Sequence, residues 1–109
     1  MNIELHAPPG KVKELLFTQI KEWLIQLHIR DREISRADVC LKESQENGED
    51  IKFCEIHLTI YGESLFARRE GPTYHKAFKK VQKELNARID RQVIGQKDLP
   101  VVIRSTVDI

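Results

Sequence analysis

The amino-acid sequence predicts an α+β fold: a two-layer β-α-β-β-β-α sandwich in which a four-stranded sheet carries both helices on one face. Three observations predict it. Apolar residues recur at helical spacing in residues 11–28 and 74–89, and they alternate with polar residues in three runs between residues 37 and 68. Asn47-Gly48 is a strong signal for a two-residue turn between two of those runs. The 109 residues suffice for one domain with one core.

The first two elements are a short strand and an amphipathic helix. Residues 2–7 form a partly alternating segment that ends at Pro8-Pro9-Gly10, because proline interrupts a strand. Residues 11–28 have one apolar stripe and are mostly polar elsewhere. A right-handed crossover through this helix would place the first strand parallel to the second. The stripe consists of Val12, Leu15, Leu16, Ile20, Trp23, Leu24 and Leu27.

The second and third strands form a predicted hairpin, whose register also bears on the two cysteines. Apolar and polar residues alternate on both sides of Asn47-Gly48. If these residues form the turn, Leu41 lies opposite Cys54, and Cys40 lies opposite Glu55. The two sulfurs would then lie on opposite faces of the sheet. We therefore expect two free thiols, with Cys54 buried and Cys40 more accessible.

The fourth strand and the second helix complete the domain. The strand follows a turn at residues 61–63, and the helix has Gly71 as its cap and Pro72 at its first position, where a missing N–H costs nothing. Gly95 is a natural stop. The sequence thus predicts one domain over residues 1–95 and a C-terminal tail over residues 96–109, either disordered or paired as an edge strand. The apolar stripe of the helix is Tyr74, Phe78, Val81, Leu85 and Ile89.

Positive charge is concentrated in this second helix. Residues 73–92 contain six lysines or arginines against two acids, a net charge of +4, whereas the whole chain carries +1. Such segregation indicates a polyanionic partner, with RNA or DNA ahead of acidic protein surfaces. The basic residues are Lys76, Lys79, Lys80, Lys83, Arg88 and Arg91.

A lysine-rich helix face can also serve solubility alone. Three details favour binding instead: no acid interrupts the cations between His75 and Lys83, Tyr74 lies beside them, and Arg68-Arg69 precede the helix. Cations near a helix N-terminus oppose the helix dipole, a small cost that a bound phosphate would reverse. The strands have no paired aromatic motif for reading bases, so the pattern indicates recognition of the backbone and shape of structured RNA.

The motifs of the common enzyme classes are missing from the sequence. There is no G-x-S-x-G elbow and no glycine-rich phosphate loop, and the four histidines and two cysteines do not have the spacing of a metal site. We therefore expect no catalysis, no cofactor, no metal and no small-molecule substrate. No apolar run has the length of a membrane span, and the N-terminus lacks the build of a signal peptide, so we expect a cytoplasmic protein without membrane contact.

Three segments resemble the ribosome hibernation promoting factor family, also called sigma-54 modulation protein or protein Y. They are residues 37–42, residues 56–62, and the stretch from Leu65 through Glu70-Gly71 to the Tyr74-containing helix start. The resemblance covers roughly residues 1–93. Two departures are the cations at the start of the second helix, where the family usually has acids, and the Pro8-Pro9-Gly10 entry to the first helix.

The resemblance implies a non-catalytic factor that binds the small ribosomal subunit and its ribosomal RNA and inhibits translation in idle ribosomes. Basic surfaces of both helices would contact the RNA. In this sequence those surfaces correspond to the six cations of the second helix and, more weakly, to Lys11, Lys13 and Lys21. With Arg68, which the charge pattern alone suggests, these are the predicted RNA-binding residues. Two alternatives stay open: a protein-binding regulatory module that uses the outer sheet face around Phe53, His57 and Phe66, and a weak homodimer through the sheet or the tail.

Overall fold

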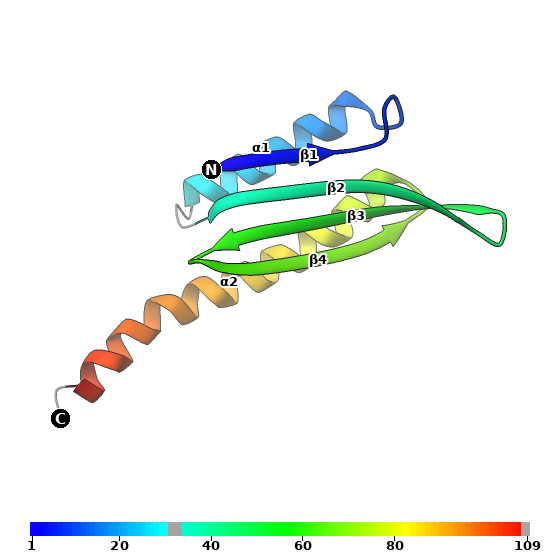
Figure 1. The fold of residues 1–109 in the computed structure, drawn as a ribbon. Coiled ribbons are helices and arrows are strands. Elements are labelled where there is room, and N and C mark those ends of the chain that lie inside the picture. Colours follow the sequence, from blue (N-terminus) through cyan, green and yellow to red (C-terminus); the bar gives the residue numbers. More distant parts are fainter. Residues whose placement is uncertain (31–33, 108–109) are drawn as a thin grey trace.

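The computed structural model describes the backbone of residues 1–30 and 34–107 and the side chains of residues 1–30 and 34–91. It contains β1 (Asn2–His6), α1 (Glu14–Arg30), β2 (Ile34–Glu46), β3 (Glu49–Ile60), β4 (Glu63–Gly71) and α2 (Tyr74–Val107). The strands form one sheet in the order β1-β2-β3-β4, and both helices cover the same face of it (Figure 1). The predicted two-layer α+β fold is confirmed.

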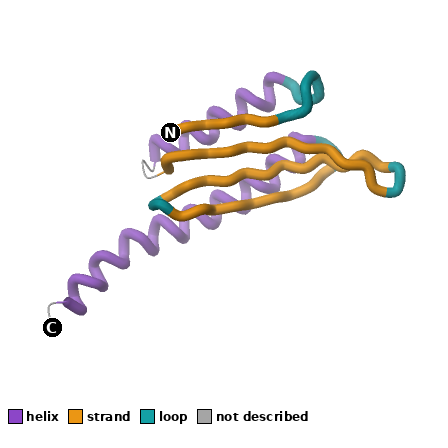
Figure 2. The backbone as a smooth tube through the Cα atoms, viewed as in Figure 1, coloured by secondary structure: helices purple, strands orange, loops and turns teal. Residues whose placement is uncertain are grey.

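The hairpin of β2 and β3 has the predicted register. β1 pairs in parallel with β2, and the other neighbours are antiparallel. Asn47 and Gly48 both have positive φ, 53° and 80°, which suits a tight hairpin turn. Leu41 pairs with Cys54 and Cys40 with Glu55, as expected, and both cysteines are free. Figure 2 shows the end of this hairpin extending beyond the neighbouring strands.

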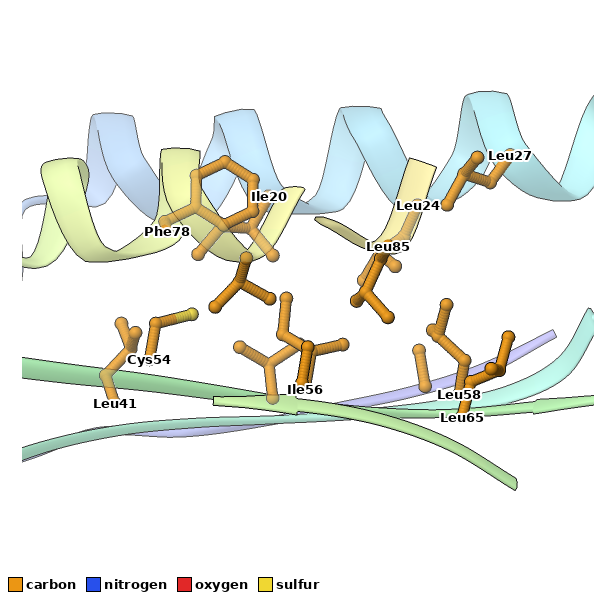
Figure 3. Close-up of a cluster of buried hydrophobic side chains, with 14 of the residues drawn as sticks. Ile20, Leu24, Leu27, Leu41, Cys54, Ile56, Leu58, Leu65, Phe78 and Leu85 are labelled. Atoms are coloured by element: carbon orange, nitrogen blue, oxygen red, sulfur yellow. The ribbon is translucent and has the colours of Figure 1, made fainter. Parts of the chain in front are cut away.

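The core lies between the sheet and the two helices. Leu24 of α1 and Leu85 of α2 meet Ile56 and Leu58 of β3 there, and all four are fully buried (Figure 3). The predicted stripe of α2 is buried throughout. In α1 the stripe is narrower than predicted, because Leu15 is 67% exposed. This residue lies about 100° around the helix from Leu16, on the far side from the sheet.

The cap of α2 lies two residues later than predicted. Gly71 is the last residue of β4, and Thr73 caps the helix: its Oγ1 accepts a hydrogen bond from the Lys76 amide over 3.1 Å. Glycine is suited to position 71 for another reason. A Cβ atom there would lie 3.1 Å from the Ala77 amide nitrogen, so a side chain would crowd the junction between β4 and α2.

The predicted end of the second helix at Gly95 is wrong, because α2 continues to Val107. Within the described residues, the segment 96–107 is therefore helical and forms no edge strand. A glycine inside a helix costs about 1 kcal/mol relative to alanine, a cost that a long helix can bear. Glycine favours a helix end because it readily adopts the left-handed conformation, but it does not require one. The C-terminal part of α2 projects past the sheet (Figure 1). The domain boundary at residue 95 stays a prediction, and residues 108–109 lie outside the described part of the chain.

Candidate nucleic-acid interface

Three lysines form the solvent side of α2. Lys76, Lys79 and Lys83 are exposed and lie opposite the buried stripe of the helix. Within the described residues, none of their side chains has an ion pair or a hydrogen bond. We call these three residues the α2 lysine surface. They span about 10 Å along the helix at ~1.5 Å per residue.

The surroundings of the α2 lysine surface are mostly uncharged. Lys79 lines a groove between the helices together with three glutamines and Glu22 of α1. No ion pair between Lys79 and Glu22 forms in the described structure. The positive charge of the three lysines therefore stays directed at solvent, where the phosphates of a nucleic acid could approach it.

Two other predicted cations of α2 attach the helix to β4. Lys80 Nζ donates a hydrogen bond to the Glu70 carbonyl over 3.0 Å, and Arg88 Nη1 donates one to the Phe66 carbonyl over 2.6 Å. Arg88 also pairs with Glu84 at 3.2 Å. These two residues have structural contacts that the three lysines lack. Arg91 is exposed near the end of the part of α2 described with side chains.

Arg68 lies on the other side of the molecule. It projects from the sheet face opposite the helices, next to Phe66, where its guanidinium lies 4.5 Å from the ring centroid of Phe53 and 3.6 Å from Glu55. It cannot contact the same stretch of RNA backbone as the α2 lysine surface without the RNA passing around the sheet. The sequence placed Arg68 near these lysines because it precedes the helix, whereas strand alternation turns its side chain away.

Most charged side chains described on the outer sheet face form ion pairs with one another. Arg36 donates hydrogen bonds of 2.8 and 2.9 Å to the carboxylate of Asp38 and also pairs with Glu4 at 3.2 Å. The hydrogen bond from Arg36 lowers the pKa of Asp38 below its ordinary value. Lys42 pairs with Glu55 at 3.2 Å. The charges on this face therefore offset one another, in contrast to those on α2.

The cations predicted in the first helix are divided between two places. Lys21 lines a hollow with residues from the end of β1 and the following loop, away from α2. Lys11 and Lys13 precede α1 and line a different cleft, shared with the start of α2. Helix α1 itself carries two acids against Lys21 and Arg30, so it adds no net charge.

That cleft has a volume of about 360 Å³ and lies where the N-terminal ends of α1 and α2 meet; we call it the α1–α2 cleft. Lys52 of β3 joins Lys11 and Lys13 there. Lys52 Nζ donates a 2.6 Å hydrogen bond to Glu43, and Lys11 approaches the same carboxylate at 3.9 Å. The bond to Lys52 lowers the pKa of Glu43, and it raises that of Lys52.

Sequence reasoning did not find Lys52. It is a single lysine in a strand, and nothing near it in the sequence distinguishes it. It reaches the cleft because it pairs in the sheet with Gly71, just before α2 begins. Only the register of β3 and β4 brings these residues together.

The chain matches no protein-family model and no curated protein. Its structure is similar to that of a ribosomal subunit interface protein from Coxiella burnetii, with a TM-score of 0.69 and 15% identity over 86% of this chain and 99% of that one. It is also similar to the N-terminal domain of protein Y from Thermus thermophilus, with a TM-score of 0.65 and 18% identity over 84% and 98%. The chain has the fold of the protein Y N-terminal domain. The resemblance inferred from the sequence is thus confirmed for the fold.

The protein Y fold of this chain brings together only part of the predicted site. Lys76, Lys79 and Lys83 share one face of α2, and Lys11 and Lys13 lie by its N-terminal end. Lys21 and Arg68 lie elsewhere. Within the described residues, no three side chains of the metal-binding types converge, and no helix combines the length and apolarity of a membrane span.

Proposed function

We propose that the protein is a non-catalytic, cytoplasmic factor that binds the small ribosomal subunit and inhibits translation in idle ribosomes. Binding is through the phosphates of ribosomal RNA on the α2 lysine surface. The observation that carries this proposal is the row of three exposed lysines, Lys76, Lys79 and Lys83, without partners in the described structure. The fold shared with a ribosomal subunit interface protein supports the ribosome as the source of that RNA.

The physical argument is electrostatic. Each lysine that neutralises a phosphate releases bound counterions, so the affinity falls steeply with salt. A lysine already paired within the protein must first break that pair, so it adds less. The α2 lysine surface is free of this cost, unlike Arg68 and Lys42 on the outer sheet face. We therefore assign the main RNA contacts to α2 and treat Lys11, Lys13 and Arg91 as flanking contacts.

The test is co-sedimentation with purified small ribosomal subunits over a range of salt concentrations. The Lys79→Gln/Lys83→Gln variant should bind more weakly, and its log–log salt slope should fall in magnitude by about 1.8 if the rule for duplex DNA applies. Lys21→Gln/Lys42→Gln is the matched control, because it removes the same charge from other surfaces. Equal losses in both variants, or no binding by the folded wild type, would contradict the proposal.

A second candidate is a protein-binding module that uses the outer sheet face. The observation that favours it is Phe66, which is 42% exposed and packs against His57 with ring centroids 4.5 Å apart. Phe66→Ala should then abolish partner capture without affecting binding to the small subunit. A homodimer through the sheet or the C-terminal residues also stays a prediction, which sedimentation velocity of the free protein would test.

A further inference from the structure

The α1–α2 cleft has the chemistry of a small ligand site. Val12 and Leu16 contribute apolar surface from the α1 side, and Pro72 contributes it from the α2 side. Lys13 and His75 stand at the same cleft and are exposed. Its volume of about 360 Å³ falls within the range of known ligand pockets, ~300–1,000 Å³, which are typically apolar with a few polar groups. An apolar surface beside cations suits a ligand with a flat ring and a negative charge.

The charge in the cleft is positive even after its internal pairing. Glu43 is shared by Lys52, at 2.6 Å, and Lys11, at 3.9 Å, so one carboxylate faces two ammonium groups. Lys13 has no ion pair within the described residues. Asp50 also acts on Lys52, so two carboxylates face three lysines. This leaves an excess of about one positive charge at the cleft, and an anion would offset that excess.

The start of α2 adds to this field. No acidic residue lies in the first turn of the helix. The amides of Tyr74 and His75 precede the first backbone hydrogen bond of the helix, which Ala77 donates to the Thr73 carbonyl over 3.0 Å. Amides at this position direct their N–H groups and the positive end of the helix dipole toward an anion.

An independent observation concerns the hydroxyl of Tyr74. Tyr74 lines the cleft and is 7% exposed, and its hydroxyl is buried without a hydrogen-bond partner in the described structure. A buried polar group without a partner costs about 1–3 kcal/mol, so such groups are rare. Lys52 Nζ lies 5.3 Å from the centroid of the same ring. An acceptor oxygen that entered beside Lys52 would satisfy the hydroxyl and meet an ammonium group.

We propose that the α1–α2 cleft binds a nucleotide, with the base against Val12, Leu16 and Pro72 and the phosphate between Lys13, the start of α2 and the Tyr74 hydroxyl. The nucleotide is either an unstacked unit of an RNA strand or a free mononucleotide. The RNA source rests on the proposed function, because the α2 lysine surface begins at Lys76, directly after the residues of the cleft. Proteins that recognise single-stranded RNA commonly bind bases that are splayed out of the strand.

The experiment is an NMR titration of the isotopically labelled full chain. The probes are uridine 5′-monophosphate, a uridine hexamer, uridine and inorganic phosphate. We expect the monophosphate to shift the amides of residues 11–13 and 73–76, and to bind more tightly than uridine or phosphate alone. A hexamer that binds more tightly than the monophosphate identifies an RNA strand as the source. Equal affinities identify the free nucleotide.

Two variants test the assigned contacts. Tyr74→Phe removes an unpartnered hydroxyl and should leave the fold intact. It should lower the affinity for the monophosphate at least threefold. Lys13→Gln changes an exposed residue and should lower the affinity for the monophosphate by a similar factor. Lys21→Gln, on the other side of α1, is the control and should bind as the wild type does. Wild-type affinity in both cleft variants would overturn the proposal, as would equal binding of phosphate and monophosphate.

The same proteins separate this proposal from the proposed function. If the protein binds the monophosphate but does not bind small subunits, the cleft proposal stands and the proposed function fails. If the protein sediments with small subunits but no probe shifts the amides of residues 73–76, the cleft proposal fails and the proposed function stands. The Lys79→Gln/Lys83→Gln variant should keep the monophosphate affinity of the wild type, because both lysines lie outside the cleft.

Discussion

Trp23 of α1 donates a hydrogen bond from its Nε1 to Asn86 Oδ1 of α2 over 3.0 Å, across 63 positions of the sequence. The same indole packs edge-on against Phe78, with ring centroids 5.6 Å apart and an interplanar angle of 72°. One side chain thus fixes the spacing of the two helices by an apolar and a polar contact. The groove that holds Lys79 depends on this spacing, because Trp23 and Phe78 line it too.

Asn86→Ala should therefore destabilise the fold. The substitution leaves the partly buried indole N–H without its acceptor, at a cost of about 1–2 kcal/mol. Urea denaturation followed by Trp23 fluorescence measures the change in the free energy of unfolding. Lys83→Ala is the control, since it alters an exposed residue on the same helix, and it should change stability by less than about 0.5 kcal/mol. Similar losses in both variants would show that helix composition, not the hydrogen bond, is responsible.

Glu84→Gln should separate stability from binding. The Glu84 carboxylate lies 2.5 Å from Arg69 Nη2 and 3.2 Å from Arg88 Nη1, so its neutralisation weakens two partly exposed ion pairs between α2 and β4 and within α2. We expect a loss of about 1 kcal/mol in the free energy of unfolding. Binding to small subunits should be unchanged or stronger, because the variant is more positive. Weaker binding by a folded Glu84→Gln protein would count against the assignment of phosphate contacts to α2.

Thr73→Ala should lower stability through the cap of α2. The Thr73 hydroxyl accepts the Lys76 amide hydrogen at 3.1 Å, and loss of such a cap costs about 0.5–2 kcal/mol. Thermal unfolding followed by circular dichroism would measure it. Thr73→Ser keeps the acceptor and should restore most of the loss, whereas an equally unstable serine variant would assign the effect to the methyl group.

The two cysteines should differ in reactivity in the folded protein. Cys54 is fully buried, and burial raises its pKa to about 12, so almost none of it is thiolate at pH 8. Cys40 lies on the opposite sheet face and is partly exposed. Alkylation at pH 8 should label Cys40 first, and Cys54 only after denaturation. Equal labelling of both in the native protein would contradict the predicted burial.

The raised pKa of Cys54 also predicts an alkaline loss of stability. The native protein keeps this proton up to about pH 12, whereas the unfolded chain releases it near the ordinary value of 9.0. The unfolded state then binds fewer protons than the native state, so stability decreases as the pH rises through this window, by at most about 1.4 kcal/mol per pH unit. Urea denaturation at pH 8 and pH 10.5 should show a smaller decrease in Cys54→Ala than in the wild type.

The hairpin and the α2 stripe could be predicted because their causes are local. Asn47-Gly48 fixes the turn, and the two-residue period of a strand then determines that Cys54 faces the core and Cys40 does not. The burial of Phe78 and Leu85 follows from helical spacing in the same way. The end of α2 could not be predicted from Gly95, because a glycine alone does not end a helix.

Only part of the candidate site could be predicted from the sequence. The charge of α2 is visible as a composition, but the sequence does not show which cations are free. Lys80 and Arg88 donate to carbonyls of β4, and that strand lies beside them only in the folded chain. The position of Arg68 in the chain suggests that it lies beside the helix, whereas its side chain contacts Phe53 and Glu55 of β3.

The sequence by itself determined the order and type of the elements, the register of the β2–β3 hairpin and the concentration of positive charge in α2. The tertiary structure alone decided which lysines have no partner, that Arg68 faces away from them, and that Lys52 of β3 joins Lys13 at the α1–α2 cleft. The physical reason is the distance along the sequence over which each interaction acts. Periodicity and turn chemistry act between residues a few positions apart, whereas ion pairing and clefts depend on residues that only packing brings together.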